Sequence, residues 1–342
     1  MLGVHCGVWD QADSKRRWVS LSFTEKDWSV ARSGFILSGS LCLPHGDGRF
    51  PVVLILQGSG KVDRDGNAGG RGAGVYLKLA RALAGYGVAS YRYDKRGVGA
   101  SGGHFLSAGY HDLADDAEAC WQALAAAPFG DPGRMYMLGH SEGTAIAAQL
   151  SSRVAHSPRA LIQLCPFDDS AETMLIHQAE GIERELPGVP GLLGFLLRLG
   201  RRFSGPYDWR MRRKLAHVRT LDGGTIRLGL TRVSARWLRE LIDLDIDGLY
   251  RAVPCPMLLI AGEKDLQCTP ESAGRLARLA SAPAEFHVVP NMVHHLSVHA
   301  GSPALLDMRD IDALPLAPEL LRLLGDWLAR EGTAAHASAA PT

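Results

Sequence analysis

Short, mostly apolar runs bounded by glycine, proline or polar residues recur along most of the chain. These runs are too short for helices. They are Val52–Leu56, Val88–Tyr93, Met135–Leu138, Ala160–Leu164, Met257–Ile260 and Phe286–Val289. Buried parallel strands have this pattern, because both of their faces are covered. Stretches with helical spacing alternate with these runs, at Val75–Tyr86, Leu113–Ala126, Leu276–Ala280 and Leu320–Arg330. The alternation predicts an α/β fold whose central sheet is mostly parallel and flanked by helices.

The first part of the chain predicts a strand pair outside that alternation. Trp18–Phe23 alternates between apolar and polar residues like a strand, and Phe35–Leu43 alternates in its second half. We expect these two segments to pair with each other. Residues 1–32 are therefore interpreted as an N-terminal extension that contains a leading strand.

The alternation of strands and helices breaks over residues 168–251. This stretch has no convincing strand pattern, but it carries an apolar stripe at helical spacing between Leu192 and Leu199. Ser234 is a suitable N-cap for a further helix that contains Trp237. We interpret the stretch as a helical cap inserted over the active face, and a rearranged piece of the main core is the alternative.

That interpretation divides the rest of the chain into a core and a tail. Residues 33–167 and 252–331 form the core, which is one domain interrupted by the insertion. Residues 332–342 are small and polar, and we expect them to be a disordered tail. Parallel sheets bind ligands at the carboxyl ends of their strands, so functional residues are sought in the segments that follow the strands.

The composition of the 342 residues is that of an ordinary globular protein, with 46% hydrophobic and 21% charged residues. The net charge of +1 gives no bias towards nucleic acid, and no zinc-finger, RNP or helix-turn-helix pattern is present. The six cysteines are scattered without a Cys-x-x-Cys pair, so we expect buried reduced thiols. The start has no secretory apolar region, and no apolar stretch approaches the ~20 residues of a membrane span. We therefore expect a cytoplasmic protein.

The segment Met135–Gly143 is the most informative in the chain. It joins an apolar run to a Gly-x-Ser-x-Gly pentapeptide, and a helix-favouring run, Thr144–Leu150, follows at once. A strand, a tight turn and a helix in this order form a nucleophile elbow. Glycine on either side of the serine allows the strand and the helix to pack closely. Ser141 is the predicted nucleophile, and the backbone N–H of Glu142 is a predicted oxyanion-hole donor.

A second Gly-x-Ser-x-Gly match lies at Gly99–Gly103. It is followed by His104 and not directly by a helix. We interpret its serine, Ser101, as a turn residue in a flexible loop. The pentapeptide alone therefore does not define a nucleophile.

A serine hydroxyl is a weak nucleophile unless a neighbouring base takes its proton. Histidine suits this role because its pKa lies near neutrality. Of the 13 histidines, His294 and His295 lie in the loop after the last predicted strand, and the residues alone leave both open. His287 lies within that strand and is expected to be structural. His140 is expected to support the elbow.

The second nitrogen of the imidazole needs an acceptor that fixes its tautomer and stabilises its charged form. Asp265 comes just after a predicted strand, and it stands between Ser141 and the candidate histidines, as the order Ser, Asp, His requires. It is the predicted acid of the set. The alternatives are Asp168, Asp169 and Glu263, which otherwise are solvated loop carboxylates.

The oxyanion hole needs a second backbone donor, which should follow the first buried strand. The segment Gln57–Gly60 has that position, and we expect the N–H of Ser59 to be the donor, with Gly60 as the alternative. The polar loop Lys61–Asn67 beside it either contacts substrate or forms a turn with internal ion pairs. Asp94–Gly99 is interpreted as structural, holding a loop near the hole.

A basic tract lies inside the predicted cap, between residues 198 and 214. Its members are Arg198, Arg201, Arg202, Arg210, Arg212, Arg213 and Lys214. Such a tract is usually a solvated helix face. The less favoured alternative is that it guides an anionic acyl donor or rests on lipid headgroups.

Three segments resemble a subgroup of bacterial serine esterases in the α/β-hydrolase superfamily. They are the loop Gly58–Asn67, the segment Tyr93–Ser101 and the elbow Gly139–Gly143, in the order of that subgroup. The resemblance runs from about residue 34 to about residue 328, apart from the predicted cap. It implies an α/β-hydrolase fold with a Ser-His-Asp triad, and it favours His294 over His295 as the base.

These inferences combine into a predicted serine hydrolase that cleaves a carboxylic ester through an acyl-enzyme. An acyl thioesterase or a small amidase or peptidase would use the same groups, and a non-catalytic binding protein is the competing class. The expected partner is a small-molecule ester or acyl substrate, which residues 168–251 are expected to contact. We expect no cofactor and no metal. The residues do not predict the oligomeric state.

Overall fold

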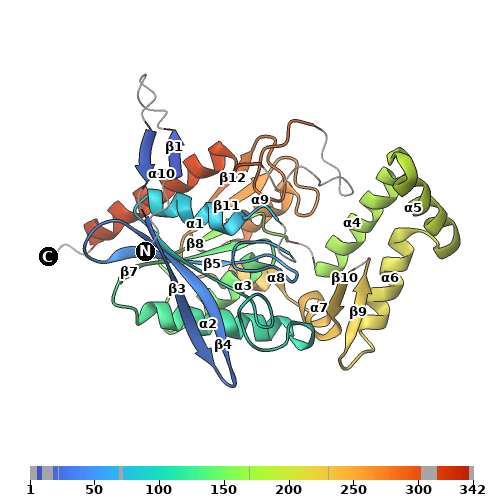
Figure 1. The fold of residues 1–342 in the computed structure, drawn as a ribbon, viewed down its shortest axis with the longest axis horizontal. Helices are drawn as coiled ribbons and strands as arrows, with labels where there is room; N and C mark the ends of the chain where they lie inside the picture. The colour runs from blue at the N-terminus through green and yellow to red at the C-terminus, as the bar shows by residue number, and fades with distance from the viewer. Residues whose placement is uncertain are drawn as a thin grey trace.

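The computed structural model describes most of the chain. The described residues are 6–9, 18–21, 23–68, 72–168, 170–229, 231–301 and 314–338. Their centre is an eight-stranded sheet with the strand order β12-β11-β8-β7-β5-β6-β4-β3 (Figure 1). The strands are β3 (Phe23–Arg32), β4 (Phe35–Pro44), β5 (Phe50–Leu56), β6 (Ala89–Tyr93), β7 (Gly130–His140), β8 (Ala160–Leu164), β11 (Met257–Gly262) and β12 (Ala284–Val289).

Six neighbouring strands of this sheet, from β12 to β6, are parallel, and β4 is antiparallel to both β6 and β3. The predicted mostly parallel sheet is therefore confirmed. Every residue of β6, β8 and β11 is buried. This explains why the sequence of these strands is apolar without strict alternation.

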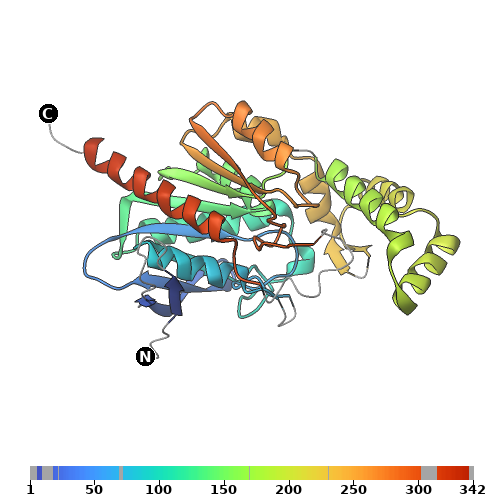
Figure 2. The same ribbon diagram turned by 90° about the horizontal axis from the view of Figure 1, so that it is seen from above.

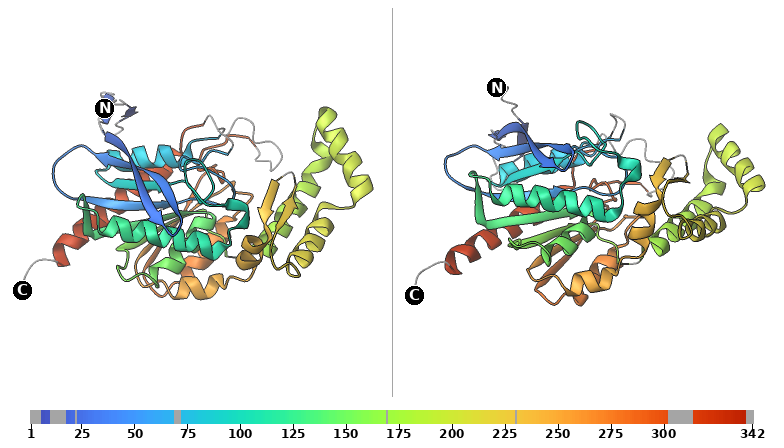
Figure 3. Two further views of the ribbon diagram at one scale, coloured as in Figure 1. Left: turned by 60° about the horizontal axis from the view of Figure 1, so that its bottom comes forward. Right: turned by 90° about the horizontal axis from the view of Figure 1, so that it is seen from below.

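Helices cover both faces of the sheet (Figures 2 and 3). The elements of the core are α1 (Val75–Gly85), α2 (Tyr110–Ala125), α3 (Glu142–Ser151), α8 (Ile246–Arg251), α9 (Pro270–Leu279) and α10 (Pro318–Ser338). On one face α1 lies beside α10, and the hydroxyl of Tyr86 at the end of α1 donates a hydrogen bond to the carbonyl of Leu321 at 2.8 Å. On the other face α2, α3, α8 and α9 follow one another, each in contact with the next.

The partner of β4 differs from the one that the sequence predicted. β4 pairs with β3, which runs from Phe23, whereas Trp18–Leu21 forms β2 and pairs with β1 (Cys6–Trp9) in a separate two-stranded sheet. The predicted pairing is wrong because β3 is an edge strand whose exposed charged residues, such as Glu25 and Lys26, hide its alternation. A two-residue turn with Gly34 at φ 84° joins β3 to β4.

The segment between β8 and α8 is inserted into the core and protrudes from it (Figure 1). It contains α4 (Ala171–Glu185), α5 (Gly191–Ser204), α6 (Tyr207–Val218), the hairpin β9 (Thr225–Leu228) and β10 (Thr231–Ser234), and α7 (Ala235–Ile242). The hairpin corrects the expectation that this stretch has no strand, because four-residue strands are too short to give a readable alternation. Ser234 caps α7 by accepting a bond from the N–H of Trp237 at 3.2 Å, as predicted.

We call residues 171–244 the inserted segment. Its interpretation as a cap over an active site stays a prediction, and α8, which the sequence assigned to the cap, packs against α3 and α9 of the core. The last helix, α10, continues to Ser338, beyond its predicted end at Arg330 and into the predicted disordered tail of residues 332–342. Alanine-rich sequence after Gly332 favours this extension. Residues 339–342 lie outside the described residues.

Two global features complete the fold. Five cysteines are free and buried, in agreement with the expectation of reduced thiols: Cys42, Cys120, Cys165, Cys255 and Cys268. In the part of the chain that the structure describes, none of the helices combines the length and the apolar character that a membrane span requires.

Candidate active site

Ser141 lies at a sharp turn between β7 and α3. Its backbone has φ 53° and ψ −121°, a conformation that costs a non-glycine residue on the order of 1–3 kcal/mol. Both positions flanking this turn in the pentapeptide require glycine, because neighbouring backbone atoms leave no room for a Cβ atom. A Cβ on Gly143 would lie 2.1 Å from the carbonyl oxygen of Leu56, and a Cβ on Gly139 would lie 2.4 Å from the carbonyl oxygen of Gly143. The sequence therefore forms a strained turn at the carboxyl end of a central strand.

Asp265 and His294 come from two other strand ends and meet beside this turn. The Nδ1 atom of His294 lies 2.8 Å from Oδ2 of Asp265. The other carboxylate oxygen, Oδ1, accepts hydrogen bonds from the N–H groups of Gln267 and Cys268 at 2.8 and 2.9 Å. Both side chains of the pair are buried. The carboxylate is thus held by backbone donors on one side and by the imidazole on the other.

The environment of the pair shifts both pKa values in the direction of the charged forms. Burial alone would lower the pKa of His294, but the charge of Asp265 and its hydrogen bond outweigh burial and raise that pKa well above the ordinary value. Burial would likewise raise the pKa of Asp265, but the charge of His294, its hydrogen bond and the two backbone N–H groups lower it. Asp265 therefore stays ionised and favours a proton on the imidazole.

Ser141 and His294 both lie near the thiol of Cys268. Burial raises the pKa of the Cys268 thiol, while hydrogen bonds with the side chains of His294 and Ser141 act in the opposite direction. The residue before the serine also contacts the histidine segment, because Nε2 of His140 donates a hydrogen bond to the carbonyl of His294 at 2.9 Å. The structure thus brings Ser141, Asp265 and His294 together, although they are far apart in the chain.

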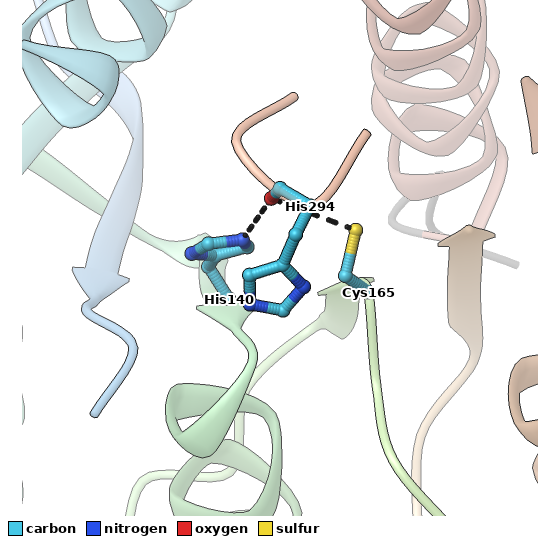
Figure 4. A group of neighbouring side chains, drawn as sticks. All are labelled: His140, Cys165 and His294. Atoms are coloured by element: carbon cyan, nitrogen blue, oxygen red, sulfur yellow. Dashed lines mark hydrogen bonds between the residues drawn. The ribbon is translucent and has the colours of Figure 1, made fainter. Parts of the chain in front are cut away.

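His140 is fixed by a chain of three hydrogen bonds, of which Figure 4 shows the contact with His294. The N–H of Gly58 donates to the hydroxyl of Tyr76 at 2.7 Å, and that hydroxyl lies 3.0 Å from Nδ1 of His140. Burial, followed by the charge of His294, lowers the pKa of His140 to about 3. His140 is therefore neutral, accepts from Tyr76 at Nδ1 and donates at Nε2. The expectation that it supports the elbow agrees with these bonds.

Two groups of side chains around His294 have the spacing of metal ligands. They are His140, Cys165 and His294, and Asp265, Cys268 and His294, with ligand atoms within 4.8 Å of one another (Figure 4). Both ring nitrogens of His140 are already committed to hydrogen bonds. Burial raises the pKa of the Cys165 thiol to about 12, and its sulfur lies 4.0 Å from the carbonyl oxygen of His294. The chemistry of these groups favours a hydrogen-bonded cluster over a metal site.

The loop after β5 lies against the serine on its other side. A Cβ on Gly58 would lie 3.2 Å from the Cβ of Ser141. The carbonyl of Gly58 accepts a hydrogen bond from Nζ of Lys95 at 2.7 Å. The Gly58–Ser59 peptide bond is trans, so the N–H of Ser59 points away from Lys95. Lys95 therefore fixes the orientation of the Ser59 amide.

Lys95 also links this loop to the elbow. Its Nζ donates to Oε2 of Glu142 at 2.9 Å, and both side chains are almost fully buried, at 3% and 2% exposure. The other oxygen of Glu142, Oε1, accepts a hydrogen bond from the indole N–H of Trp237 on α7. We call Lys95, Glu142 and Trp237 the Lys95 network. It joins the two segments that carry the predicted oxyanion donors to the inserted segment.

The sequence identified only part of this network. Asp94–Gly99 was expected to hold a nearby loop, and Lys95 does hold the loop at Gly58, but neither the contact of Tyr76 with His140 nor that of Trp237 was predicted. Their partners lie 64 and 95 positions away in the chain, so no local pattern reports them. The available hint was that Tyr76 and Trp237 lie in predicted helices, because the O–H of tyrosine and the N–H of tryptophan usually find a hydrogen-bond partner when buried.

The residues that competed for catalytic roles have other partners. Ser101 is buried, and its hydroxyl donates to the carbonyl of Asp94 at 2.7 Å and accepts from the N–H of Ser38 at 2.9 Å, which makes it structural. His287 lies 2.7 Å from Oε1 of Glu285 on the same strand. The ring of His295 lies edge-on to that of His294, with centroids 6.0 Å apart.

The competing acids are also engaged elsewhere. Asp168 forms an ion pair with Arg275 of α9. Glu263 accepts a hydrogen bond from the N–H of Asn291 at 2.8 Å. The third alternative, Asp169, lies outside the described residues. Of the described candidates, Asp265 is therefore the one that contacts a candidate histidine.

The polar loop after the predicted oxyanion segment is braced by internal contacts. Asp63 accepts from the N–H groups of Asp65 and Asn67 at 3.0 and 2.9 Å. Arg64 pairs with Asp94 at 2.8 Å, and Asp65 pairs with Arg92 at 2.7 Å. The loop is therefore a turn, but these ion pairs join it to Arg92 and Asp94, whereas the sequence-based alternative expected ion pairs within the loop.

A small cavity lies between this loop and the inserted segment. Its lining residues come from both sides: Gly60, Lys61, Phe105, Ala108, Leu113, Thr231, Arg232, Val233, Ser234 and Trp237. The lining is mostly apolar, with Lys61 and Arg232 as its charged members. The cavity begins one residue beyond Ser59 and shares Trp237 with the Lys95 network.

A family model described as serine aminopeptidase, S33 matches residues 69–299, which is more than half of the chain. The chain belongs to this family. Its match covers Ser141, Asp265 and His294 as well as the inserted segment.

The relatives of this chain include an esterase and a lipase. The chain is 26% identical to esterase EstD of Thermotoga maritima over 72% of this chain and 53% of the relative. It is 32% identical to lysophosphatidylserine lipase ABHD12 of Danio rerio over 40% of this chain and 34% of the relative. The chain thus spans about half, or less, of the length of these relatives.

Solved structures show the fold. Est1E from Butyrivibrio proteoclasticus, with ferulic acid bound, superposes with a TM-score of 0.59 at 15% identity, covering 91% of this chain and 99% of that chain. The α/β hydrolase GrgF from Penicillium sp. sh18 superposes with a TM-score of 0.58 at 17% identity, covering 90% and 98%. The family member described here therefore has the α/β-hydrolase fold.

Proposed function

We propose that this α/β hydrolase is a serine esterase that cleaves a carboxylic ester through Ser141, His294 and Asp265. The observation that carries the proposal is the buried 2.8 Å contact between Asp265 and His294 beside the strained turn of Ser141. In such a set the imidazole takes the proton of the serine hydroxyl, and the carboxylate orients the imidazole and stabilises its charged form. The esterase and lipase names of the relatives support an ester as the substrate.

In the proposed mechanism, His294 removes the proton of Ser141 as its oxygen attacks the ester carbonyl. Asp265 holds the imidazole in the tautomer whose Nδ1 carries hydrogen and stabilises the imidazolium that forms. The alcohol leaves with the proton from His294, and an acyl-enzyme remains. Water activated by the same histidine then releases the acid.

The N–H groups of Ser59 and Glu142 are the proposed oxyanion donors. Preorganised donors of this kind stabilise the negative charge that develops on the carbonyl oxygen. Lys95 acts as a positioning residue, because it holds the Gly58 carbonyl, whose peptide bond carries the Ser59 amide, and the side chain of Glu142. Its bond to the Gly58 carbonyl orients the Ser59 amide, and its bond to the Glu142 side chain ties that loop to the elbow.

Peptide hydrolysis is the second candidate, because the family description names an aminopeptidase. An aminopeptidase substrate carries a positive amine close to the scissile bond. The cavity beside the proposed oxyanion loop has two cationic residues and no carboxylate among the described residues that line it. This charge disfavours a cationic substrate, and an ester with an apolar group fits the lining better.

The test is hydrolysis of p-nitrophenyl esters of graded acyl length by the purified protein. We expect turnover that Ser141→Ala abolishes while the circular dichroism spectrum and the melting temperature stay close to those of the wild type. Ser101→Ala is the matched control, because it alters the other Gly-x-Ser-x-Gly serine, and it should keep ester turnover. Undiminished hydrolysis by Ser141→Ala would refute the proposal, and faster cleavage of aminoacyl anilides than of esters would favour the peptidase.

A further inference from the structure

The outer face of α5 exposes an unusual amount of apolar surface. Its stripe consists of Leu192, Phe195, Leu196, Leu199 and Phe203, whose exposures are 73%, 57%, 52%, 38% and 81%. The spacing of three, four, seven and eleven residues from Leu192 puts all five on one side of the helix. Of the twelve exposed large apolar side chains in the described part of the chain, these five and Trp209 make six, and the other six are scattered over the core.

The opposite side of α5 is the one that attaches it to the protein. Gly194 is buried, and a Cβ there would lie 1.9 Å from the carbonyl oxygen of Val189. Arg198 donates to the same carbonyl at 2.9 Å, and Arg201 pairs with Glu183 of α4. The exposed stripe is therefore not needed to hold the helix in place. An apolar patch of this kind on a protein surface usually marks an interaction site, because it otherwise promotes aggregation.

The charge around this stripe is strongly positive. Residues 191–218, which form α5 and α6, carry seven Lys and Arg residues and one acid, Asp208, in a chain whose net charge is +1. Glu183 and Glu180 of α4 pair with Arg201 and Arg212, so an excess of positive charge remains. Two of the cations lie over aromatic rings of α6, with Arg213 4.8 Å from the ring of the exposed Trp209 and Arg210 5.2 Å from that of Tyr207.

We propose that α5 and α6 are a docking surface for an anionic phospholipid membrane. The apolar stripe would enter the boundary between headgroups and acyl chains, and the arginines would contact the phosphates. A second copy of the chain fits less well, because two-fold pairing of this surface would oppose two cationic patches. Figures 1 and 2 show α5 at the outer end of the inserted segment, farthest from the sheet, where a flat surface can approach it.

The experiment is sedimentation of the full chain with vesicles, one set of equimolar phosphatidylglycerol and phosphatidylcholine and one of phosphatidylcholine alone. We expect binding to the anionic vesicles that exceeds binding to neutral ones and that weakens when salt rises from about 0.1 M to about 1 M. The double variant Phe195→Ser with Phe203→Ser should lower the partition coefficient about tenfold or more. Its circular dichroism spectrum and melting temperature should match the wild type, because both side chains are exposed.

The matched control is Ile36→Ser with Val288→Ser, which removes two exposed apolar side chains from the core, at 54% and 41% exposure. It should bind anionic vesicles as the wild type does. Absence of vesicle binding by the wild type, or equal binding by the α5 variant, overturns the proposal. Sedimentation velocity adds the remaining outcome: a wild-type dimer that the α5 variant separates, without vesicle binding, would assign the surface to a second copy and also overturn it.

Discussion

Charged side chains are buried and paired at the carboxyl edge of the sheet, whereas they lie near the surface on the outer helices of the inserted segment. At the sheet edge, Lys95, Glu142 and Asp265 are buried, and the charged group of each forms at least two hydrogen bonds. On α5 and α6 the charged groups lie at or near the surface, and the apolar stripe of α5 faces water. Hydrogen bonds fix the side chains of the first region, whereas the second region presents an apolar surface that no described residue covers.

The energetic consequences of the two arrangements differ. Removing one partner of a buried ion pair costs about 3–5 kcal/mol, because the remaining charge is left without compensation. A surface pair contributes about 0–1 kcal/mol. A buried network therefore suits the positioning of reacting groups, whereas exposed charges can rearrange around a partner. The following variants test this difference.

Asp265→Asn should give the largest loss. The amide cannot stabilise the imidazolium and favours the wrong tautomer of His294, so we expect kcat to fall about 10⁴-fold with a small change in KM. Single-turnover and steady-state ester kinetics measure the loss. A variant with kcat within threefold to tenfold of the wild type, about 1 kcal/mol in barrier height, would separate Asp265 from the reaction.

Lys95→Met should damage both catalysis and stability. It frees the Gly58 carbonyl and leaves the buried Glu142 carboxylate without its cation, so we expect kcat to fall about 10²-fold, the scale of losing one oxyanion donor. The free energy of unfolding should fall by about 3–5 kcal/mol. Urea unfolding and ester kinetics below the melting transition give the two values.

The double variant Lys95→Met with Glu142→Gln separates the two effects. The amide removes the buried charge and can still accept from Trp237, so stability should largely return while kcat stays low. Arg212→Gln, which breaks the exposed pair with Glu180, is the surface counterpart and should change stability by less than about 1 kcal/mol. Full recovery of kcat in the double variant would contradict a positioning role for Lys95.

Trp237→Phe tests the bond that joins the two regions. Phenylalanine keeps most of the aromatic wall of the cavity but loses the indole N–H that Glu142 accepts. We expect kcat to fall about tenfold through a small displacement of the elbow, with KM for short esters nearly unchanged. A change confined to KM would assign Trp237 to substrate contact alone.

The pH dependence of kcat/KM gives the smallest effect, a shift of the acid limb. His294 must be neutral to accept a proton, and Asp265 raises its pKa, so activity should fall as the pH drops through a value above about 6.5, the ordinary pKa of histidine. Removing the carboxylate in Asp265→Asn leaves burial, which lowers the pKa, and should move the limb to lower pH. An acid limb below about 6.5 in the wild type would contradict the dominant influence of Asp265.

Most of the core could be predicted from sequence because its signals are local. Each buried strand is one apolar run, and Ser141, Asp265 and His294 each follow one of them, so the mostly parallel sheet and the candidate residues came from the same pattern. The choice of His294 over His295 came from the family resemblance. The two misread regions have physical causes. In β3 the exposed charges of an edge strand hide the alternation, and in β9 and β10 the strands are too short to produce one.

The fine structure around Ser141 could not be predicted in the same way. Tyr76 and Trp237 reach their partners only after the chain has folded, and the exposure of Phe195 and Phe203 depends on which side of α5 packs inward. The stripe in the sequence indicated a helix but not which face of it would be covered, and the structure leaves the stripe in solvent. The catalytic roles of the candidate residues remain predictions that the variants above address.

The most direct measurement is labelling of the purified protein with a fluorophosphonate, followed by mass spectrometry of its peptides. Only a serine whose proton is taken by a neighbouring base reacts at an appreciable rate. We predict a single adduct on the peptide that contains Ser141, and its loss in His294→Ala. An unlabelled wild-type protein, or an adduct on Ser101 in place of Ser141, would contradict the account.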